Sequence, residues 1–165
     1  MVIIGGNEMQ PMDTKIRSVV ELFHYPMWFI KLDKDVTCPC IDHASKEPKH
    51  DCPICLGTGY KIKVVRSKAA RQTTETASMR GIGLGYGEKN ASDIYFSITD
   101  LELQEGDIIV DNGHTDIVQY YAPGRTNDNK PVYYRIHAIR KNIDNGKFLI
   151  AFNNLLKRNG YGSEH

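Results

Sequence analysis

Short runs of alternating apolar and polar residues fill the second half of the chain, which is the pattern of half-buried β-strands. Turn residues separate the runs, and Asp111-Asn112-Gly113 is the clearest hairpin signal because Asn and Gly tolerate a positive φ. Strands are predicted at residues 94–98, 108–110, 115–121, 132–140 and 148–152. Short antiparallel strands at this spacing are typical of a small β-barrel or sandwich. We expect a barrel, because closure leaves no exposed sheet edge.

The first part of the chain predicts one helix and two further strands. Asp13 and Thr14 can cap a short helix, which Pro26 ends. Apolar runs at residues 27–32 and 61–66 predict strands, and the second can continue into the polar residues 67–80. The expected fold is therefore mainly β, a small antiparallel β-barrel with a short N-terminal helix packed against it.

All four cysteines lie between these two strands, in the turns Cys38-Pro-Cys40 and Cys52-Pro-Ile-Cys55. Zinc takes four sulfur or nitrogen ligands in a tetrahedron, and two short thiol turns separated by 11 residues provide them without a preformed core. We therefore expect a structural zinc ion bound by Cys38, Cys40, Cys52 and Cys55. Such an ion would staple an insert at the tip of a β-hairpin.

Other ligands and other uses of the cysteines stay open. The single residue between Cys38 and Cys40 makes a tight turn for two thiolates, so His50, or else His43, is an alternative ligand. The second thiol pair has the spacing of a redox motif, but the glycines after Cys55 argue against the helix that such a motif opens. A disulfide is disfavoured, because the chain begins without a signal-peptide pattern and a reducing cytosol is expected.

Composition fits one soluble domain that carries a small insert. Charged residues are 25% and hydrophobic residues 41% of the 165 residues. No run approaches the roughly 20 consecutive apolar residues of a membrane span, so no membrane partner is expected. The expected organisation is an N-terminal arm, helix and first strand (1–35), a zinc-ribbon-like insert (36–62), the remainder of the barrel (63–158) and a flexible tail (159–165).

The formal net charge of +1 gives no global sign of a nucleic-acid partner, so such a role depends on local clusters. One cluster follows the cysteines, where six cations within 20 residues are opposed by Glu75 alone: Lys61, Lys63, Arg66, Lys68, Arg71 and Arg80. Such a strand face can bind phosphates without sequence specificity. The alternative is a solvated strand face.

Four glycines alternate with other residues from Gly81 to Gly87. No helix-forming segment follows them, so a nucleotide phosphate loop is not expected. Ile82, Leu84 and Tyr86 place three apolar side chains in this loop, and they either enter the core or meet a partner.

The sequence gives little support for an enzymatic function. There is no serine nucleophile elbow, no His-Glu pair at helical spacing and no acidic cluster for a catalytic metal. His24, His114 and His137 fall on different predicted elements. A zinc ion with four cysteine ligands also has no open position for water. We therefore expect no catalytic residues.

Two segments resemble known families. Cys52 to Tyr60 (CPICLGTGY) resembles half of the cysteine-rich repeat of J-domain co-chaperones over nine residues, which implies shared zinc-ribbon geometry only. The segment from Asp93 to about Tyr121, with DIYF followed by GDIIV, resembles tailed-bacteriophage neck proteins of the head-closure, or stopper, type. This second likeness is one of pattern, over roughly the last 75 residues.

The second resemblance implies a structural virion protein of the phage neck, a small β-barrel that forms a homo-oligomeric ring around the DNA channel. The implied protein is made in the host cytoplasm, and its partners are the portal or adaptor and the tail proteins. Arg66, Lys68, Arg71 and Arg80 are then candidates for non-specific DNA contact, and Ile82, Leu84 and Tyr86 for an inter-subunit loop. The competing hypothesis is a zinc-ribbon module that binds single-stranded or duplex nucleic acid.

Overall fold

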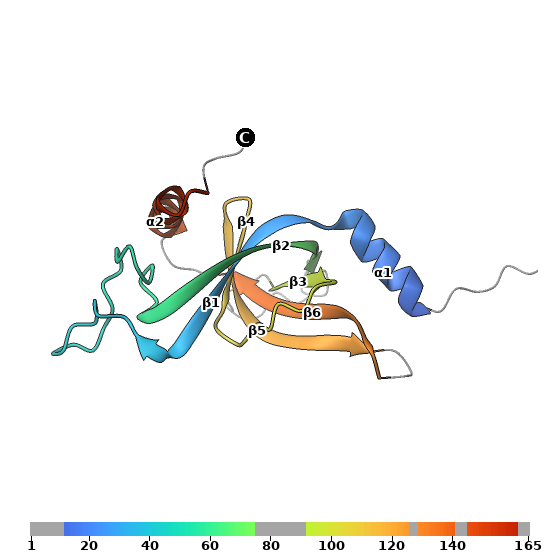
Figure 1. Ribbon diagram of the computed structural model, residues 1–165, viewed down its shortest axis with the longest axis horizontal. Helices are drawn as coiled ribbons and strands as arrows, with labels where there is room; N and C mark the ends of the chain where they lie inside the picture. Colours follow the sequence, from blue (N-terminus) through green and yellow to red (C-terminus); the bar gives the residue numbers. More distant parts are fainter. Residues whose placement is uncertain (1–11, 75–91, 126–128, 141–144, 162–165) are drawn as a thin grey trace, which may run out of the picture.

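The computed structural model describes residues 12–74, 92–125, 129–140 and 145–161 (Figure 1). These residues form a closed barrel of antiparallel strands with a helix near each end. The elements are α1 (Met12–Phe23), β1 (Tyr25–Thr37), β2 (Tyr60–Thr74), β3 (Ser92–Ser97), β4 (Ile108–Asp111), β5 (His114–Arg125), β6 (Pro131–Arg140) and α2 (Asn145–Arg158). The predicted antiparallel barrel with a short N-terminal helix is confirmed.

Strand β1 closes the barrel because it pairs along both of its edges. One edge pairs with β2 from Tyr25 to Asp33, and the other pairs with β4 at residues 28–30. Around the barrel the order is β1-β2-β3-β6-β5-β4. Beyond the β4 pairing, β1 and β2 run on together as a two-stranded ribbon, and residues 38–59 form an insert at its end (Figure 1).

The strands separate two apolar clusters, one inside the barrel and one outside it. Successive strand residues point to opposite faces, so Phe29 enters the interior while its neighbour Ile30 packs outside. The interior cluster also contains Tyr95, Ile109 and Ile136. The outer cluster joins the same stretch of β1 and β4 to helix α2 and to Leu56 of the insert.

The prediction of a strand at residues 148–152 is wrong, because these residues lie in helix α2. Phe148 and Phe152 are four residues apart, so on a helix both face the barrel, where they are 8% and 1% exposed. Ile150 lies between them and points away, 65% exposed. A strand would place all three residues on one face, so this burial pattern follows the helical period, and the helix begins at Asn145.

At the other end of the barrel, α1 packs against β2 and β6 and buries Val20. Figure 1 shows α1 and the insert at opposite ends of the long axis of the molecule. Within the described ranges, no helix combines the length and the apolar character that crossing a membrane requires.

The barrel also holds a buried polar network. The Arg71 guanidinium bonds Asp93 at 2.6 Å and Asp111 at 3.1 Å, and the Tyr25 hydroxyl donates to Asp111 at 2.7 Å. Asp93 and Asp111 are each 2% exposed, so their charges depend on this cation. Arg71 thereby links β2 to β3, its neighbour in the barrel, and to β4, which is the neighbour of β1.

A third buried carboxyl, Asp116, accepts a hydrogen bond from the Tyr95 hydroxyl. Burial raises the pKa of Asp116, and the nearby charge of Asp93 raises it further. Burial and the bond to Asp116 likewise raise the pKa of Tyr95 far above its usual range. Both groups therefore favour their protonated forms inside the barrel.

The network predicts that Arg71→Ala will strongly destabilise the barrel, because it leaves Asp93 and Asp111 buried without their cation. We expect a loss of about 3–5 kcal/mol in the free energy of unfolding, measured by urea titration and circular dichroism. The control is Arg66→Ala, which removes a guanidinium 5.5 Å from the Trp28 ring centroid and should cost about 0.5–1 kcal/mol. Equal losses from the two variants would contradict the role of the network.

The raised pKa of Asp116 predicts a pH-dependent contribution to stability. A carboxyl whose pKa is higher in the folded than in the unfolded protein stabilises most below the unfolded value of about 3.9. That contribution is lost as the pH rises through the folded pKa. We expect Asp116→Asn to gain unfolding free energy relative to the parent protein as the pH rises from about 4 to about 8, measured by urea titration at each pH. A difference that stays constant with pH would refute this prediction.

Candidate metal centre

The insert is shaped by short turns that need glycine at two positions. Gly57 and Gly59 have φ values of 78° and 80°, which side-chain-bearing residues rarely adopt. A Cβ on Gly57 would also lie 2.9 Å from the carbonyl oxygen of His50. The backbone N–H of Cys38 donates to the carbonyl of Gly59 at 2.8 Å, so the two ends of the insert are joined directly.

Backbone hydrogen bonds fold each cysteine turn back on itself. In the second turn, the N–H of Leu56 donates to the carbonyl of Cys52 at 2.9 Å, and the N–H of Thr58 donates to that of Cys55 at 3.0 Å. The Thr58 hydroxyl donates to the same Cys55 carbonyl at 2.7 Å. In the first turn, the N–H of Ile41 donates to the carbonyl of Cys38 at 3.2 Å. These bonds hold the thiol pair of each turn together.

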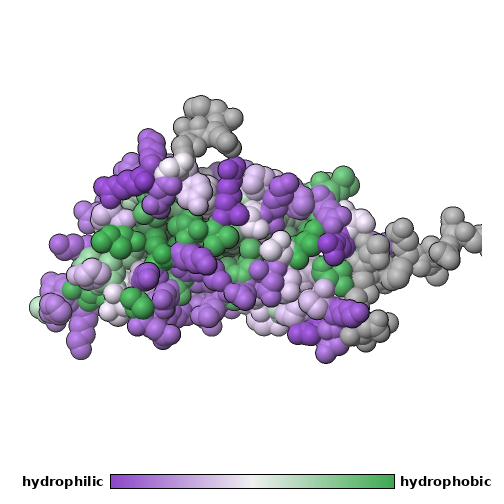
Figure 2. Space-filling model, viewed as in Figure 1, coloured by the Kyte–Doolittle hydropathy of each residue, from purple (hydrophilic) through white to green (hydrophobic). Residues whose placement is uncertain are grey.

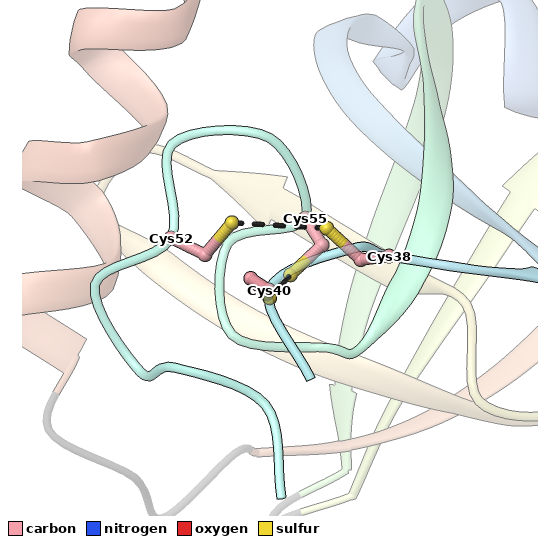
Figure 3. Close-up of side chains that lie close together, drawn as sticks. All are labelled: Cys38, Cys40, Cys52 and Cys55. Atoms are coloured by element: carbon pink, nitrogen blue, oxygen red, sulfur yellow. Dashed lines mark hydrogen bonds between the residues drawn. The ribbon is translucent and has the colours of Figure 1, made fainter. Parts of the chain in front are cut away.

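The four sulfur atoms meet between the two turns (Figure 3). The Sγ atoms of Cys38 and Cys52 lie 3.8 Å apart, those of Cys40 and Cys55 lie 3.4 Å apart, and all four fall within 4.8 Å of one another. A disulfide would bring two sulfurs to about 2.05 Å, so these cysteines are free. A metal about 2.3 Å from each of four tetrahedral thiolates would set them about 3.8 Å apart. The group therefore has the dimensions of a tetrahedral metal site.

Burial and backbone donors act oppositely on these thiols. Burial raises the pKa of Cys38, and it raises that of Cys55 to about 12. Burial opposes ionisation of Cys52 too, but the N–H groups of Cys55 and Ile54 favour its thiolate and bring its pKa down to about 7. A cation among the sulfurs would favour all four thiolates, so metal binding and thiol ionisation support each other.

The alternative ligands lie outside this group. His43 and His50 are both exposed, and among the described residues only the four cysteines form a cluster of metal-binding side chains. Cys38, Cys52 and Cys55 are buried, and Cys40 is half-buried. The structure therefore favours an all-cysteine site over one that includes a histidine.

The predicted DNA-facing cations separate into three groups. Arg66 and Lys68 are exposed on β2, as are Lys61 and Lys63 nearer the insert. Arg71 differs from the prediction, because its side chain is only 15% exposed and its guanidinium is paired with two carboxylates inside the barrel. Arg80 and the glycine-loop residues Ile82, Leu84 and Tyr86 lie outside the described residues.

A cleft between the insert and α2 is a feature that the sequence reasoning missed. It has a volume of about 910 Å³, and residues 49–57 form one wall and residues 147–158 the other. The cleft depends on α2, for which a strand was expected at residues 148–152. The spacing of Phe148, Phe152, Leu155 and Leu156, which is the i, i+4, i+7, i+8 pattern of a helix face, is the signal that could have shown it.

The cysteine group and the cleft thus meet in one region, because the loop that carries Cys52 and Cys55 also forms a wall of the cleft. Comparisons of the chain with protein-family models and with curated proteins find no match.

Proposed function

We propose that the four cysteines bind one structural zinc ion. Tetrahedral coordination by four thiolates suits zinc, and two short turns from one loop are the usual frame of such a site. Iron accepts the same four sulfurs, so metal analysis discriminates between the two. With four protein ligands the ion has no open position for water, and its role is structural, not catalytic.

The zinc ion would hold the insert together in place of a hydrophobic core. The apolar cluster within the insert consists of the cysteines themselves, Cys38, Cys52 and Cys55, with Cys40 packed against them. The barrel has its own interior cluster, which includes Phe29 and Ile136 and contains no residue of the insert. The metal therefore orders the insert while the barrel folds on its own core.

We propose further that the protein is a non-enzymatic structural subunit of a phage neck, which forms a ring between the portal and the tail. The segment that resembles head-closure proteins, Asp93 to Tyr121, contributes β3, β4 and most of β5 to the closed barrel. A compact closed barrel with projecting helices suits a subunit whose contacts lie on its periphery. The partners implied are copies of the chain, the portal or adaptor and the tail proteins.

The observation that carries this proposal is the exposed apolar face of α1. Val19, Leu22 and Phe23 lie on one short helix and are 55%, 75% and 64% exposed. Large apolar side chains gathered on one projecting element mark an interaction site, because exposing them to water is unfavourable. A neighbouring subunit in a ring would cover this face.

A second candidate function, a zinc-ribbon nucleic-acid-binding module, is favoured by a different observation. Lys61, Lys63, Arg66 and Lys68 are exposed along β2 next to the insert. Side chains alternate along a strand, so Lys61 and Lys63 point to one face of β2 and Arg66 and Lys68 to the other. Arg71 does not add to either pair, because its charge is matched inside the barrel. Each pair of exposed cations can contribute to salt-dependent phosphate binding.

We expect one equivalent of zinc in protein purified under reducing conditions, measured by inductively coupled plasma mass spectrometry, and none in Cys55→Ser. Hydrogen exchange of this variant should speed up in residues 38–59, while β5 and β6 keep their protection because the barrel core is separate. A protein with no metal, or with iron, would refute the zinc assignment. Global unfolding on chelation would refute the separation of insert and barrel.

We expect the protein to assemble into rings when mixed with its portal complex, seen by electron microscopy and native mass spectrometry. Leu22→Asp should prevent assembly without loss of folding, because Leu22 is 75% exposed. Lys15→Asp places the same charge at another exposed position of α1 and is the control. A protein that stays monomeric with the portal and binds oligonucleotides would refute the neck proposal in favour of the nucleic-acid module.

A further inference from the structure

The cleft between the insert and α2 is apolar along its walls. Leu56 of the insert and Phe148 of α2 line it while they pack together in the outer cluster. Pro53 and Ile150 stand nearer the solvent, and Ile150 is 65% exposed. Figure 2 shows apolar surface on this side of the molecule, where α2 lies above the insert in the same view of Figure 1. The cleft thus offers apolar surface that nothing within the described residues covers.

The charges that line the cleft are mainly positive. Lys49 comes from the insert and Lys147 and Arg158 come from the two ends of α2, whereas Asp51 is the one carboxylate among the lining residues. All four of these residues are exposed, so the cations can bend toward a ligand in the cleft. An apolar floor with cations around it favours a ligand that combines apolar groups with carboxylates.

The size of the cleft sets a further limit on the ligand. Its volume of about 910 Å³ lies near the upper end of the roughly 300–1,000 Å³ that is common for ligand pockets. A few side chains of a peptide fill such a space. Duplex nucleic acid fits this site poorly, because the cations flank an apolar wall and do not form a continuous phosphate track.

We propose that this cleft binds a short segment of a partner protein in which apolar residues are flanked by aspartate or glutamate. The apolar side chains would lie between Leu56 and Ile150, and the carboxylates would bond Lys49, Lys147 and Arg158. This is the groove mode of peptide recognition, in which apolar anchors give affinity and the surrounding charges give orientation and specificity.

The inference rests on the proposed structural zinc ion, because the metal would fix one wall of the cleft. Pro53 lies between Cys52 and Cys55, and Leu56 follows directly, so the ligand turn and the cleft wall are the same piece of chain. The opposite wall is held by α2, whose Phe152 is 1% exposed in the outer cluster. Loss of the metal would loosen one wall and leave the other in place.

The test is selection of peptides from a random displayed library by the full, zinc-loaded chain. We expect the selected peptides to carry net negative charge and an apolar residue at the centre, and to bind more weakly as salt increases. Fluorescence anisotropy of labelled selected peptides then measures affinity. Ile150→Asp should weaken binding at least tenfold, and the double variant Lys147→Glu with Arg158→Glu should weaken it by a similar factor at low salt.

Two controls separate the cleft from the rest of the surface. Tyr120→Asp on β5 and Lys15→Glu on α1 introduce the same kinds of charge at exposed positions that do not line the cleft, and should leave affinity unchanged. The exposure of Ile150 makes Ile150→Asp compatible with folding, which circular dichroism and the zinc content check.

Several results would overturn the proposal. These are selected peptides without net negative charge, affinity that Ile150→Asp does not change, or displacement of the peptides by a DNA duplex. Binding that survives chelation, after the insert has lost its exchange protection, would also overturn it. If the protein holds one zinc ion but selects no peptides, only the proposal of peptide binding is refuted. If the protein holds no zinc, the proposed zinc site is refuted.

Discussion

The double pairing of β1 is the constraint on which the rest of the structure depends. Residues 28–30 pair with β4 on one side and with β2 on the other, so the sheet closes and has an inside and an outside. The alternation of side chains along this stretch then divides the apolar residues, with Phe29 in the barrel and Ile30 under α2. Beyond the residues that pair with β4, β1 and β2 continue as the ribbon that carries the insert.

The barrel and the insert are stabilised by different means. The barrel combines an apolar interior with a buried network in which Arg71 neutralises carboxylates from β3 and β4. The insert is too small for such a core, and its four cysteines meet at distances that suit a tetrahedral metal. The proposed metal would supply cohesion where chain length cannot, and it would let a short loop stand out from the barrel and still present a defined surface.

The strands and the four-cysteine cluster could be predicted from the sequence because their signals are local. Alternation and turn residues located β3 to β6, and the four cysteines fall within 18 residues. Residues 148–152 are five apolar residues in a row, which contain no unambiguous period, so the helix and its cleft were missed. The pairing of Arg71 joins strands that are distant in sequence, and a pattern along one strand cannot show it.

X-ray absorption at the zinc edge of the purified protein tests the central claim most directly, because it measures which atoms surround the metal and at what distance. A zinc ion that orders the insert through Cys38, Cys40, Cys52 and Cys55 should show four sulfur atoms at about 2.3 Å. A shell that includes nitrogen or oxygen atoms at about 2.0–2.2 Å would contradict the account, because it would mean that a histidine or water has replaced a cysteine ligand.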